Sequence, residues 1–369
     1  MKQKLHPLII ALILLAGALP AAAQAPIIAS LSQNGRLVCS NLAPASVASI
    51  EWASSLSGPW HTNWSSLTEV PVASNGIISL SVPMFYRVRG FNTNYFTTEG
   101  TVLIPAGSFT MGDVLDGDFN ALPTAVYVSG FFMDTNLVTL SKWQTVYDWA
   151  TNNGYSFDHA GSAAGPNYPV TIVSWYDCVK WCNARSQQAG LAPCYYTDTN
   201  LTQVYRTGQA GNFAVFQNLN YGGYRLPTEA EWEKAARGQI AGARFPRGNT
   251  ISQSQANYTA NTATNYDLGP NGNNWGNAPT PVGAFSPNGY GLYDMAGNLD
   301  QWCWDVYGDS LGQPTTNNPT GATTGTYRHP IRGGSFNDNA YVLRCAYRSQ
   351  TYPPAAVAAT VGFRCVRPQ

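Results

Sequence analysis

The chain has 369 residues, and its 20 basic and 20 acidic side chains give a formal net charge of zero. Because phosphate binding needs a surplus of Lys and Arg, this balance argues against a nucleic-acid partner and against a polybasic membrane-surface helix. The 11 Trp and 21 Tyr residues are too many aromatic residues for a disordered chain. The length allows two or three domains, each large enough to bury a core.

Residues 1–25 have the pattern of a secretory signal peptide. Lys2 and Lys4 precede an apolar stretch from about Leu8 to Leu19, and small-x-small cleavage sites follow it. That stretch is too short to span a bilayer comfortably, and no later apolar run reaches the roughly 18 residues that a membrane helix needs. We therefore expect an exported protein, periplasmic, cell-surface or secreted, with no membrane span after cleavage.

Export decides how the seven cysteines are interpreted, because disulfides are the default in an oxidising compartment. Seven is an odd number, so at least one thiol is left over. Cys39 is expected to be that one, since it lies far from the others in the sequence. The spacing Cys178-x-x-x-Cys182 is not that of a redox pair, and no Cys/His grouping has the spacing of zinc ligands.

Residues 26–96 are predicted to form a small β-sandwich-like module. Four stretches alternate apolar and polar residues or are rich in β-forming residues, namely LVCSNL, ASIEWASS, IISLSVPM and FYRVRGF. Turn signals such as Ser57-Gly58-Pro59 separate them. The module has no cluster of charged residues or histidines, so we expect a spacer, and an adhesive role stays open.

Residues 97–369 are predicted to form one long domain, and its first helix is indicated by periodicity. Trp143, Val146, Tyr147 and Ala150 fall on one face of a helix that is expected to begin at Ser141. Trp143, Trp149, Trp175 and Trp232 are expected to pack into the core or between helices.

Capping signals mark two further helices. Ser174 to Asp177 resembles a capping box, at the start of a helix that is expected to run to about Gln188. Thr228 to Glu231 is a T-x-x-E capping box, and Gly238 provides the stop. After Gly238, about 130 residues show almost no helical periodicity, which is unusual for a compact domain. Disulfides or bound metal ions are the expected means of holding such a region together.

Eight motifs occur in order along this domain. They are LIPAGSFTMGD (Leu103 to Asp113), FFMDTNLVT (Phe131 to Thr139), PVTIVSWYDCVKWCN (Pro169 to Asn183), YRLPTEAEWEKAARG (Tyr224 to Gly238), FPRGN (Phe245 to Asn249), NGYGLYDMAGNLDQWCWD (Asn288 to Asp305), IRGGSF (Ile331 to Phe336) and GFRCVRP (Gly362 to Pro368). The series resembles the formylglycine-generating enzyme family, also called sulfatase-modifying factor, over roughly residues 97–369. The resemblance implies an α+β fold, a variant of the C-type lectin fold with low regular secondary structure, here preceded by a small all-β domain.

The resemblance also implies a reaction that this chain is poorly equipped to perform. Active members oxidise a cysteine in a sulfatase to formylglycine, with O₂ and a copper(I) ion held by two thiolates just after the GGS-aromatic motif. Copper(I) is soft and prefers such ligands. Between Phe336 and Arg344 this chain has no cysteine, so no catalytic residue is assigned and copper is not expected. Ser335 matches the pocket serine of the family.

The remaining cysteines receive structural roles from the resemblance. Cys182 and Cys365 match a family disulfide that ties the second helix to the C-terminal strand. For Cys303 and Cys345 a structural disulfide is favoured, and a substitute thiolate pair is the alternative. The partners of Cys178 and Cys194 stay open.

Family members also carry structural calcium, which prefers six to eight hard oxygen ligands. One site matches Asn257, the Tyr258 carbonyl and Asp267. The other matches Asp294, the carbonyls of Gly297 and Leu299, and Gln301. The second departs from the pattern, because the usual W-E-W string reads Asp300-Gln301-Trp302 here. Without the resemblance, these residues would be interpreted as turn caps.

Three functions follow as expectations. The first is a catalytically degenerate member that binds an unknown peptide, protein or other ligand outside the cytoplasm. The second is an active formylglycine-generating or related oxidase that modifies a cysteine or another residue in exported proteins. The third is a structural or adhesive surface protein. The missing thiol pair favours the first.

Overall fold

The computed structural model describes residues 27–31, 36–40, 47–52, 70–71, 73–75, 77–81, 86–90 and 100–369, except for 211–213, 219–221, 309–315, 323–326 and 349–350. Contacts divide the chain into two units, residues 1–95 and 96–369. The expected signal peptide lies outside the described residues. In the part of the chain that the structure describes, no helix has the length and apolar character needed to cross a membrane.

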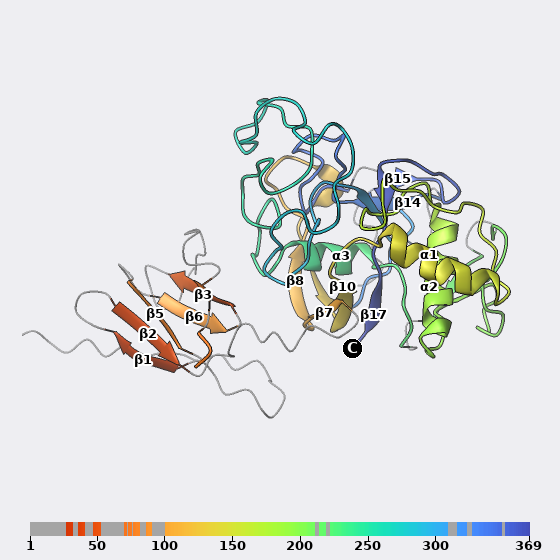
Figure 1. The fold of residues 1–369 in the computed structure, drawn as a ribbon, viewed down its shortest axis with the longest axis horizontal. Helices are drawn as coiled ribbons and strands as arrows, with labels where there is room; N and C mark the ends of the chain where they lie inside the picture. The colour runs from red at the N-terminus through yellow and green to blue at the C-terminus, as the bar shows by residue number, and fades with distance from the viewer. Residues whose placement is uncertain are drawn as a thin grey trace, which may run out of the picture. The chain divides into compact units, whose positions relative to one another are not determined.

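The described residues of the first unit form two three-stranded antiparallel sheets, with strand orders β1-β2-β5 and β4-β3-β6 (Figure 1). The strands are β1 (Ile27–Leu31), β2 (Arg36–Ser40), β3 (Val47–Trp52), β4 (Val70–Pro71), β5 (Ile78–Ser81) and β6 (Tyr86–Gly90). The four β-rich stretches of the sequence correspond to β2, β3, β5 and β6. Cys39 in β2 is buried, and this burial raises the pKa of its thiol to about 11.

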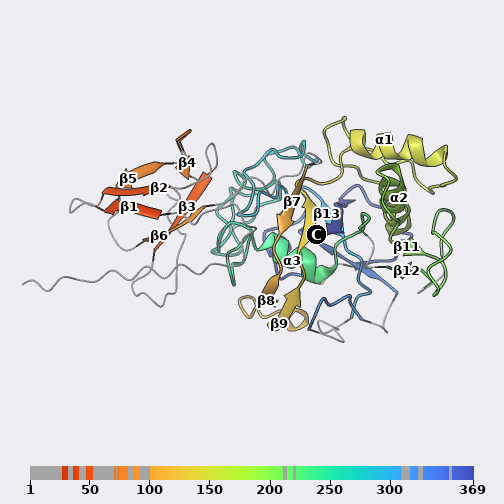
Figure 2. The same cartoon turned by 90° about the horizontal axis from the view of Figure 1, so that it is seen from below.

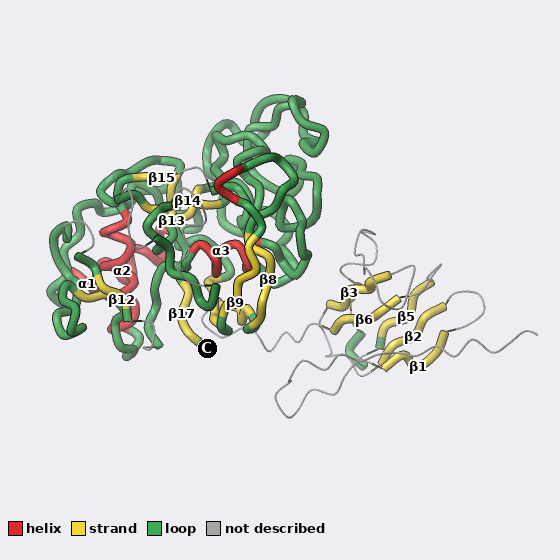
Figure 3. Tube along the Cα trace, turned by 180° about the vertical axis from the view of Figure 1, so that it is seen from behind, coloured by secondary structure: helices red, strands yellow, loops and turns green. Residues whose placement is uncertain are grey.

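The second unit has an α+β fold in which short sheets are joined by long loops, as the resemblance predicted (Figure 3). Its sheets have the orders β17-β10-β7, β15-β14-β13-β16, β8-β9 and β11-β12. The strands are β7 (Thr101–Ile104), β8 (Gly107–Met111), β9 (Thr124–Val128), β10 (Phe131–Asp134), β11 (Tyr195–Tyr196), β12 (Phe216–Gln217), β13 (Asp300–Trp302), β14 (His329–Arg332), β15 (Thr351–Tyr352), β16 (Val361–Gly362) and β17 (Val366–Pro368). A short 3-10 helix, η3, spans Phe119–Ala121.

The helices are α1 (Leu140–Thr151), α2 (Trp175–Gln188) and α3 (Glu229–Ala236). Both predicted capping boxes are confirmed, the first with Ser174 and Asp177 and the second with Thr228 and Glu231. Helix α1 begins one residue before the predicted Ser141. The reason is that the Thr139 side chain, rather than a later residue, accepts the free amide of Lys142 and caps the helix.

Helices α1 and α2 lie side by side (Figure 2), and the core packs them against the last residues of the chain. Trp143 of α1 stacks on Trp181 of α2 with ring centroids 5.7 Å apart, and Phe363 meets Trp143 edge-on at 5.9 Å. Such pairs add to the free energy gained by burying the rings. Helix α3 lies apart from this pair, against β8, β9 and β14, and so beneath the Gly-Gly-Ser turn that follows β14.

Candidate functional site

Helix α3 carries a network of buried ion pairs that fixes the segments around the Gly-Gly-Ser turn. Glu229 accepts two hydrogen bonds from the Arg348 guanidinium, at 3.1 and 2.7 Å. Glu233 accepts from Arg332 at 2.6 Å and from Arg237 at 2.7 Å. All five side chains are buried. The ion pairs therefore tie α3 to the end of β14 and to the segment after Arg344.

Two glycines give the turn after β14 its shape. Gly333 and Gly334 have φ angles of 98° and 67°, in the region that side chains rarely adopt. A Cβ on Gly334 would also lie 2.6 Å from Leu343 Cδ1, so the turn packs directly on the loop that follows it. This geometry places Ser335 in the interior, with only 1% of its surface exposed.

Ser335 is hydrogen-bonded to an aspartate that is paired with a second aspartate. The Ser335 hydroxyl and amide donate to Asp338 Oδ2 at 2.6 and 2.9 Å. Asp300, the first residue of β13, lies within hydrogen-bonding reach of the Asp338 carboxyl and accepts from the Gly334 amide. Burial, and then the neighbouring Asp338, raise the pKa of Asp300 well above its usual range. The segment expected to carry thiolates in active enzymes thus contributes one member of an acid pair, Asp338, and β13 contributes the other.

The two cysteines nearest this turn are not available as thiolates. Cys345 is completely buried, and burial raises its pKa to about 12. Cys303 is also completely buried, and burial followed by the charge of Glu229 raises its pKa well above the usual range. Because the thiolate is the metal ligand and the nucleophile, neither sulfur fits the substitute copper pair. Whether they form a disulfide stays a prediction.

The structure brings together Cys182 and Cys365, the other cysteine pair that the resemblance implies. The Sγ atoms of Cys182 on α2 and Cys365 before β17 are 3.5 Å apart and unbonded, and both residues are buried. Cys178 and Cys194 also lie near Cys365, and burial raises the pKa of each of these two thiols. A bridge between Cys182 and Cys365 therefore needs only a small movement, and it stays a prediction.

The first expected calcium set has its oxygens largely engaged by the protein. Asp267 accepts hydrogen bonds from the Tyr258 hydroxyl and from two backbone amides. The Asn257 side-chain oxygen accepts from Asn273 at 3.1 Å, and the Tyr258 carbonyl accepts from Gln253 at 3.2 Å. These contacts are those of turn caps, and they leave few lone pairs for a cation.

In the second expected calcium set, the side-chain oxygens of Gln301 and Asp294 differ in their hydrogen bonds. Gln301 Oε1 already accepts from Trp232 at 2.8 Å and from Arg364 at 2.7 Å, and its Nε2 donates to the Asp294 carbonyl. Asp294 has a φ of 53° and is buried, and its Oδ2 accepts from the Gly283 amide. Its Oδ1 has no hydrogen-bond partner among the described residues. Asp294 fits a calcium ligand, whereas the Gln301 side chain does not.

Beside the acid pair, an exposed apolar loop spans residues 113–122. Its large side chains are turned to solvent, with exposed fractions of 71% for Val114, 44% for Leu115, 76% for Phe119 and 57% for Leu122. Few monomeric proteins expose several such residues together without a partner. The apolar loop is therefore a candidate interaction surface.

Ion pairs hold the apolar loop against the segment that replaces the thiol loop. Asp116 pairs with Arg244 and Arg344, each at 2.9 Å, and Asp118 pairs with Arg344 and with the Tyr341 hydroxyl. Gly112 precedes the loop and has no room for a side chain, because a Cβ would lie 2.2 Å from the Ala121 carbonyl oxygen. The backbone is thus fixed while the apolar side chains point outward.

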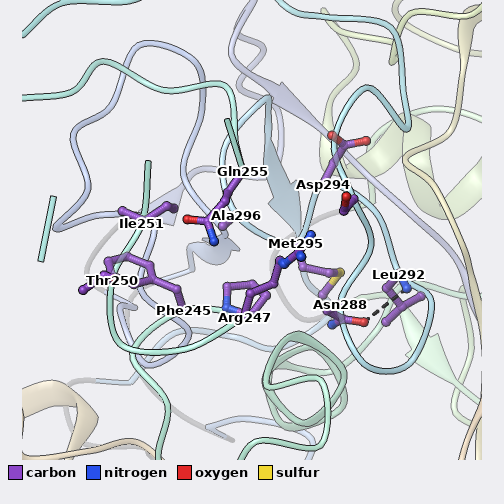
Figure 4. A pocket seen from close by; sticks show the side chains of 12 residues that line it. Phe245, Arg247, Thr250, Ile251, Gln255, Asn288, Leu292, Asp294, Met295 and Ala296 are labelled. Atoms are coloured by element: carbon purple, nitrogen blue, oxygen red, sulfur yellow. Dashed lines mark hydrogen bonds between the residues drawn. The ribbon is translucent and has the colours of Figure 1, made fainter. Parts of the chain in front are cut away.

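A small pocket lies between the FPRGN segment and the turn that contains Asp294 (Figure 4). Its volume is about 30 Å³, enough for a water molecule but not for a peptide or an organic substrate. Asp294 is among the residues that line the pocket, and its carboxylate is turned away from Met295 and Asn288 (Figure 4). The pocket is not the candidate ligand site.

Neither the acid pair nor the apolar loop was predicted from the sequence. A signal for the pair was present, because Asp300 stands where the W-E-W string has its first Trp. The loop had a weaker signal, the adjacent apolar residues Val114 and Leu115 between aspartates. Only the contacts with Arg344 and Tyr341 show that the apolar loop lies against the chain segment that contains Asp338.

Comparisons with known proteins agree with the order of the motifs. A model of the sulfatase-modifying factor enzyme 1-like domain matches residues 89–369. The formylglycine-generating enzyme of Thermomonospora curvata is 33% identical over 299 residues, which cover 72% of this chain and 93% of that protein. A Chlamydia pneumoniae protein named serine/threonine-protein kinase pkn1 is 42% identical over 273 residues, which cover 72% of this chain but only 37% of that protein. The solved structure of CarF has a TM-score of 0.56 and 28% identity, and the match covers 73% of this chain and 98% of that one.

Proposed function

Because the chain belongs to the sulfatase-modifying factor family, we propose that it keeps the family's fold to bind a protein segment and does not oxidise it. The main support for this proposal comes from the segment between Phe336 and Arg344, which has no thiol and packs against the apolar loop. The expected signal peptide, residues 1–25, supports an action outside the cytoplasm.

The ligand that suits the apolar loop is a peptide segment that presents apolar side chains. Burying a side chain such as Phe119 or Leu122 against a partner gains about 1.5–3 kcal/mol. The carboxylates of Asp116 and Asp118 already have arginine partners, so charge does not select the ligand. Binding should therefore change little with salt concentration. A fixed backbone also reduces the ordering cost of association.

A peptide-display selection with a random library tests this proposal directly. The probes are the full chain, its Phe119→Ser/Leu122→Ser variant, and Val357→Ser as an exposed apolar control in another segment. We expect the wild type and the control to enrich peptides with apolar residues, and the double variant to lose them. No enrichment, or enrichment unchanged in the double variant, would overturn the proposal and favour a structural role.

The alternative function, formylglycine formation, has its own assay. A CxPxR-type sulfatase peptide is incubated with the protein, copper and a reductant, and the product is measured by mass spectrometry. We expect no aldehyde, because Cys303 and Cys345 are buried and their pKa values are raised. Aldehyde above a no-enzyme control would establish the oxidase and refute the binding-only proposal.

We also propose a structural calcium ion at Asp294, together with the carbonyls of Gly297 and Leu299. The support is the buried, unpartnered Oδ1 of Asp294, since a buried carboxylate oxygen without a donor is costly. Burial raises the pKa of Asp294, and a cation would offset this effect. Gln301 is left out of the ligand set, because its side-chain oxygen already accepts two hydrogen bonds.

A further inference from the structure

The pair formed by Asp300 and Asp338 differs from the buried carboxylates of the domain that face an arginine. Asp134 pairs with Arg185, Glu229 with Arg348 and Glu233 with Arg332, at distances of 2.6–2.7 Å. Asp300 is only 3% exposed, yet no Lys or Arg nitrogen of the described residues lies within 4 Å of its carboxylate. Its closest ionisable neighbour is another acid.

The unsatisfied atom of this pair can be identified. Asp338 Oδ2 is held by the Ser335 hydroxyl and amide, and the Gly334 amide donates to Asp300. Oδ1 of Asp300 has no hydrogen-bond donor in the described part of the chain. A buried carboxylate oxygen without a donor carries the full cost of its lost hydration. The two carboxylates therefore face each other with no positive charge between them, and one of their oxygens has no donor.

We propose that Asp300 and Asp338 bind one hard divalent cation in the place of the thiolate-bound copper of active relatives. Carboxylate oxygens are the ligands that Mg²⁺, Mn²⁺ and Ca²⁺ prefer, just as thiolates suit copper(I). Two protein carboxylates with water in the remaining positions are a common arrangement for Mg²⁺ and Mn²⁺. Asp338 is half-buried, so one side of the pair is open to solvent.

The cation would bridge β13 and the loop after the Gly-Gly-Ser turn, which strand pairing and the Phe336 to Asn298 hydrogen bond already hold together. Asp300 begins β13, whereas Asp338 lies in the loop beside the apolar loop. The Asp338 carbonyl accepts from the Thr259 amide at 2.9 Å, so the ion would also reach the long loop region. This site is separate from the calcium proposed at Asp294, which uses a different carboxylate, and it does not depend on the proposed peptide binding.

Manganese binding to the demetallated full chain tests this inference. Free Mn²⁺ is measured by electron paramagnetic resonance during a titration near neutral pH, and Mg²⁺ and Ca²⁺ are then added as competitors. The variants are Asp300→Asn and Asp338→Asn, which keep the shape but remove one charge each. Asp294→Asn is the matched control, because it removes a carboxylate from the proposed calcium site only. Circular dichroism checks the fold of each variant.

We expect Asp300→Asn and Asp338→Asn each to lose one bound Mn²⁺ per chain, and Asp294→Asn to keep it. Competition by Mg²⁺ or Ca²⁺ identifies the natural class of ion. Equal Mn²⁺ stoichiometry in the wild type and both variants would overturn the inference. A second result would also overturn it: metal-free Asp300→Asn melts at a higher temperature than the wild type, and no bound Mn²⁺ is lost. In that case a proton shared by the two carboxyl groups, and not a cation, would hold the pair. If Asp300→Asn does not fold, the Mn²⁺ stoichiometry of Asp338→Asn decides the test, because Asp338 is only half-buried.

Discussion

The helical half of the domain and its loop-rich half bury carboxylates in opposite ways. Around α2 and α3, Asp134, Glu229 and Glu233 each face an arginine. In the loops after Gly238, Asp294 and Asp300 are buried with no Lys or Arg nitrogen within 4 Å in the described residues. The helical half neutralises its charges with its own side chains, whereas these two carboxylates of the loop half have no such counter-charge among the described residues.

The same physical effects produce opposite outcomes in the two halves. Burial alone would raise the pKa of Glu229, but Arg348 and Arg332 lower it below the ordinary value. Burial raises the pKa of Asp294, and in Asp300 the neighbouring Asp338 adds to that rise. Burial therefore does not decide the charge of a carboxylate, and the partner does. The following predictions test this contrast, from the largest expected effect to the smallest.

Glu233→Gln should be the most damaging change. It leaves the buried guanidiniums of Arg332 and Arg237 without their shared counter-charge, and breaking a buried pair costs about 3–5 kcal/mol. Urea unfolding measures the loss, with exposed Asp148→Asn as a control that should change stability by less than about 0.5 kcal/mol. A Glu233→Gln loss as small as that of the control would show that the network does not hold the helical half.

Removing the expected bridge should destabilise the same half by about 2–5 kcal/mol, because Cys182 and Cys365 lie 183 positions apart and would close a long loop. The variant is Cys182→Ser/Cys365→Ser, and thermal melting with and without reductant gives the effect. Thiol titration of the unreduced, denatured chain should find at least two fewer thiols than the seven cysteines of the sequence. Seven free thiols would rule the bridge out.

Acid should weaken the fold through His329, which stacks on Trp175 with ring centroids 3.9 Å apart. Burial lowers the pKa of His329 from 6.5 to about 4. Between these values the unfolded chain binds a proton that the folded chain does not, so stability falls as pH falls from about 6.5 to about 4, by up to about 3 kcal/mol. His329→Phe should lose this part of the pH dependence in unfolding titrations. An unchanged profile would mean that folding does not lower the pKa of His329.

Chelation should lower the melting temperature through the loop half. An ion that binds only the folded state, at a free concentration of about 100 times its Kd, stabilises the folded state by about 2.7 kcal/mol. Asp294→Ala should remove most of the sensitivity to chelator, because Asp294 holds the unpartnered oxygen. Identical melting of the demetallated and calcium-loaded wild type would leave these residues as turn caps only.

Local sequence signals determined the helices and the family. The capping residues Ser174 and Thr228 act on amides three positions away, so their effect can be seen in a short window of sequence. The ordered motifs predicted the α+β fold, and the missing cysteines after Phe336 predicted the loss of the thiol pair.

The tertiary structure alone decided which distant side chains meet. Glu229 and Arg348 are 119 positions apart, and no local pattern indicates that they pair. In the sequence, Asp300 is one departure from a motif and Asp338 is a loop residue. In the fold, β13 and the Gly-Gly-Ser turn bring them together. The exposure of Phe119 likewise depends on the ion pairs of Arg344 across the fold. Local hydrogen bonds leave a signature within one segment, whereas burial and charge pairing depend on contacts that only the folded chain creates.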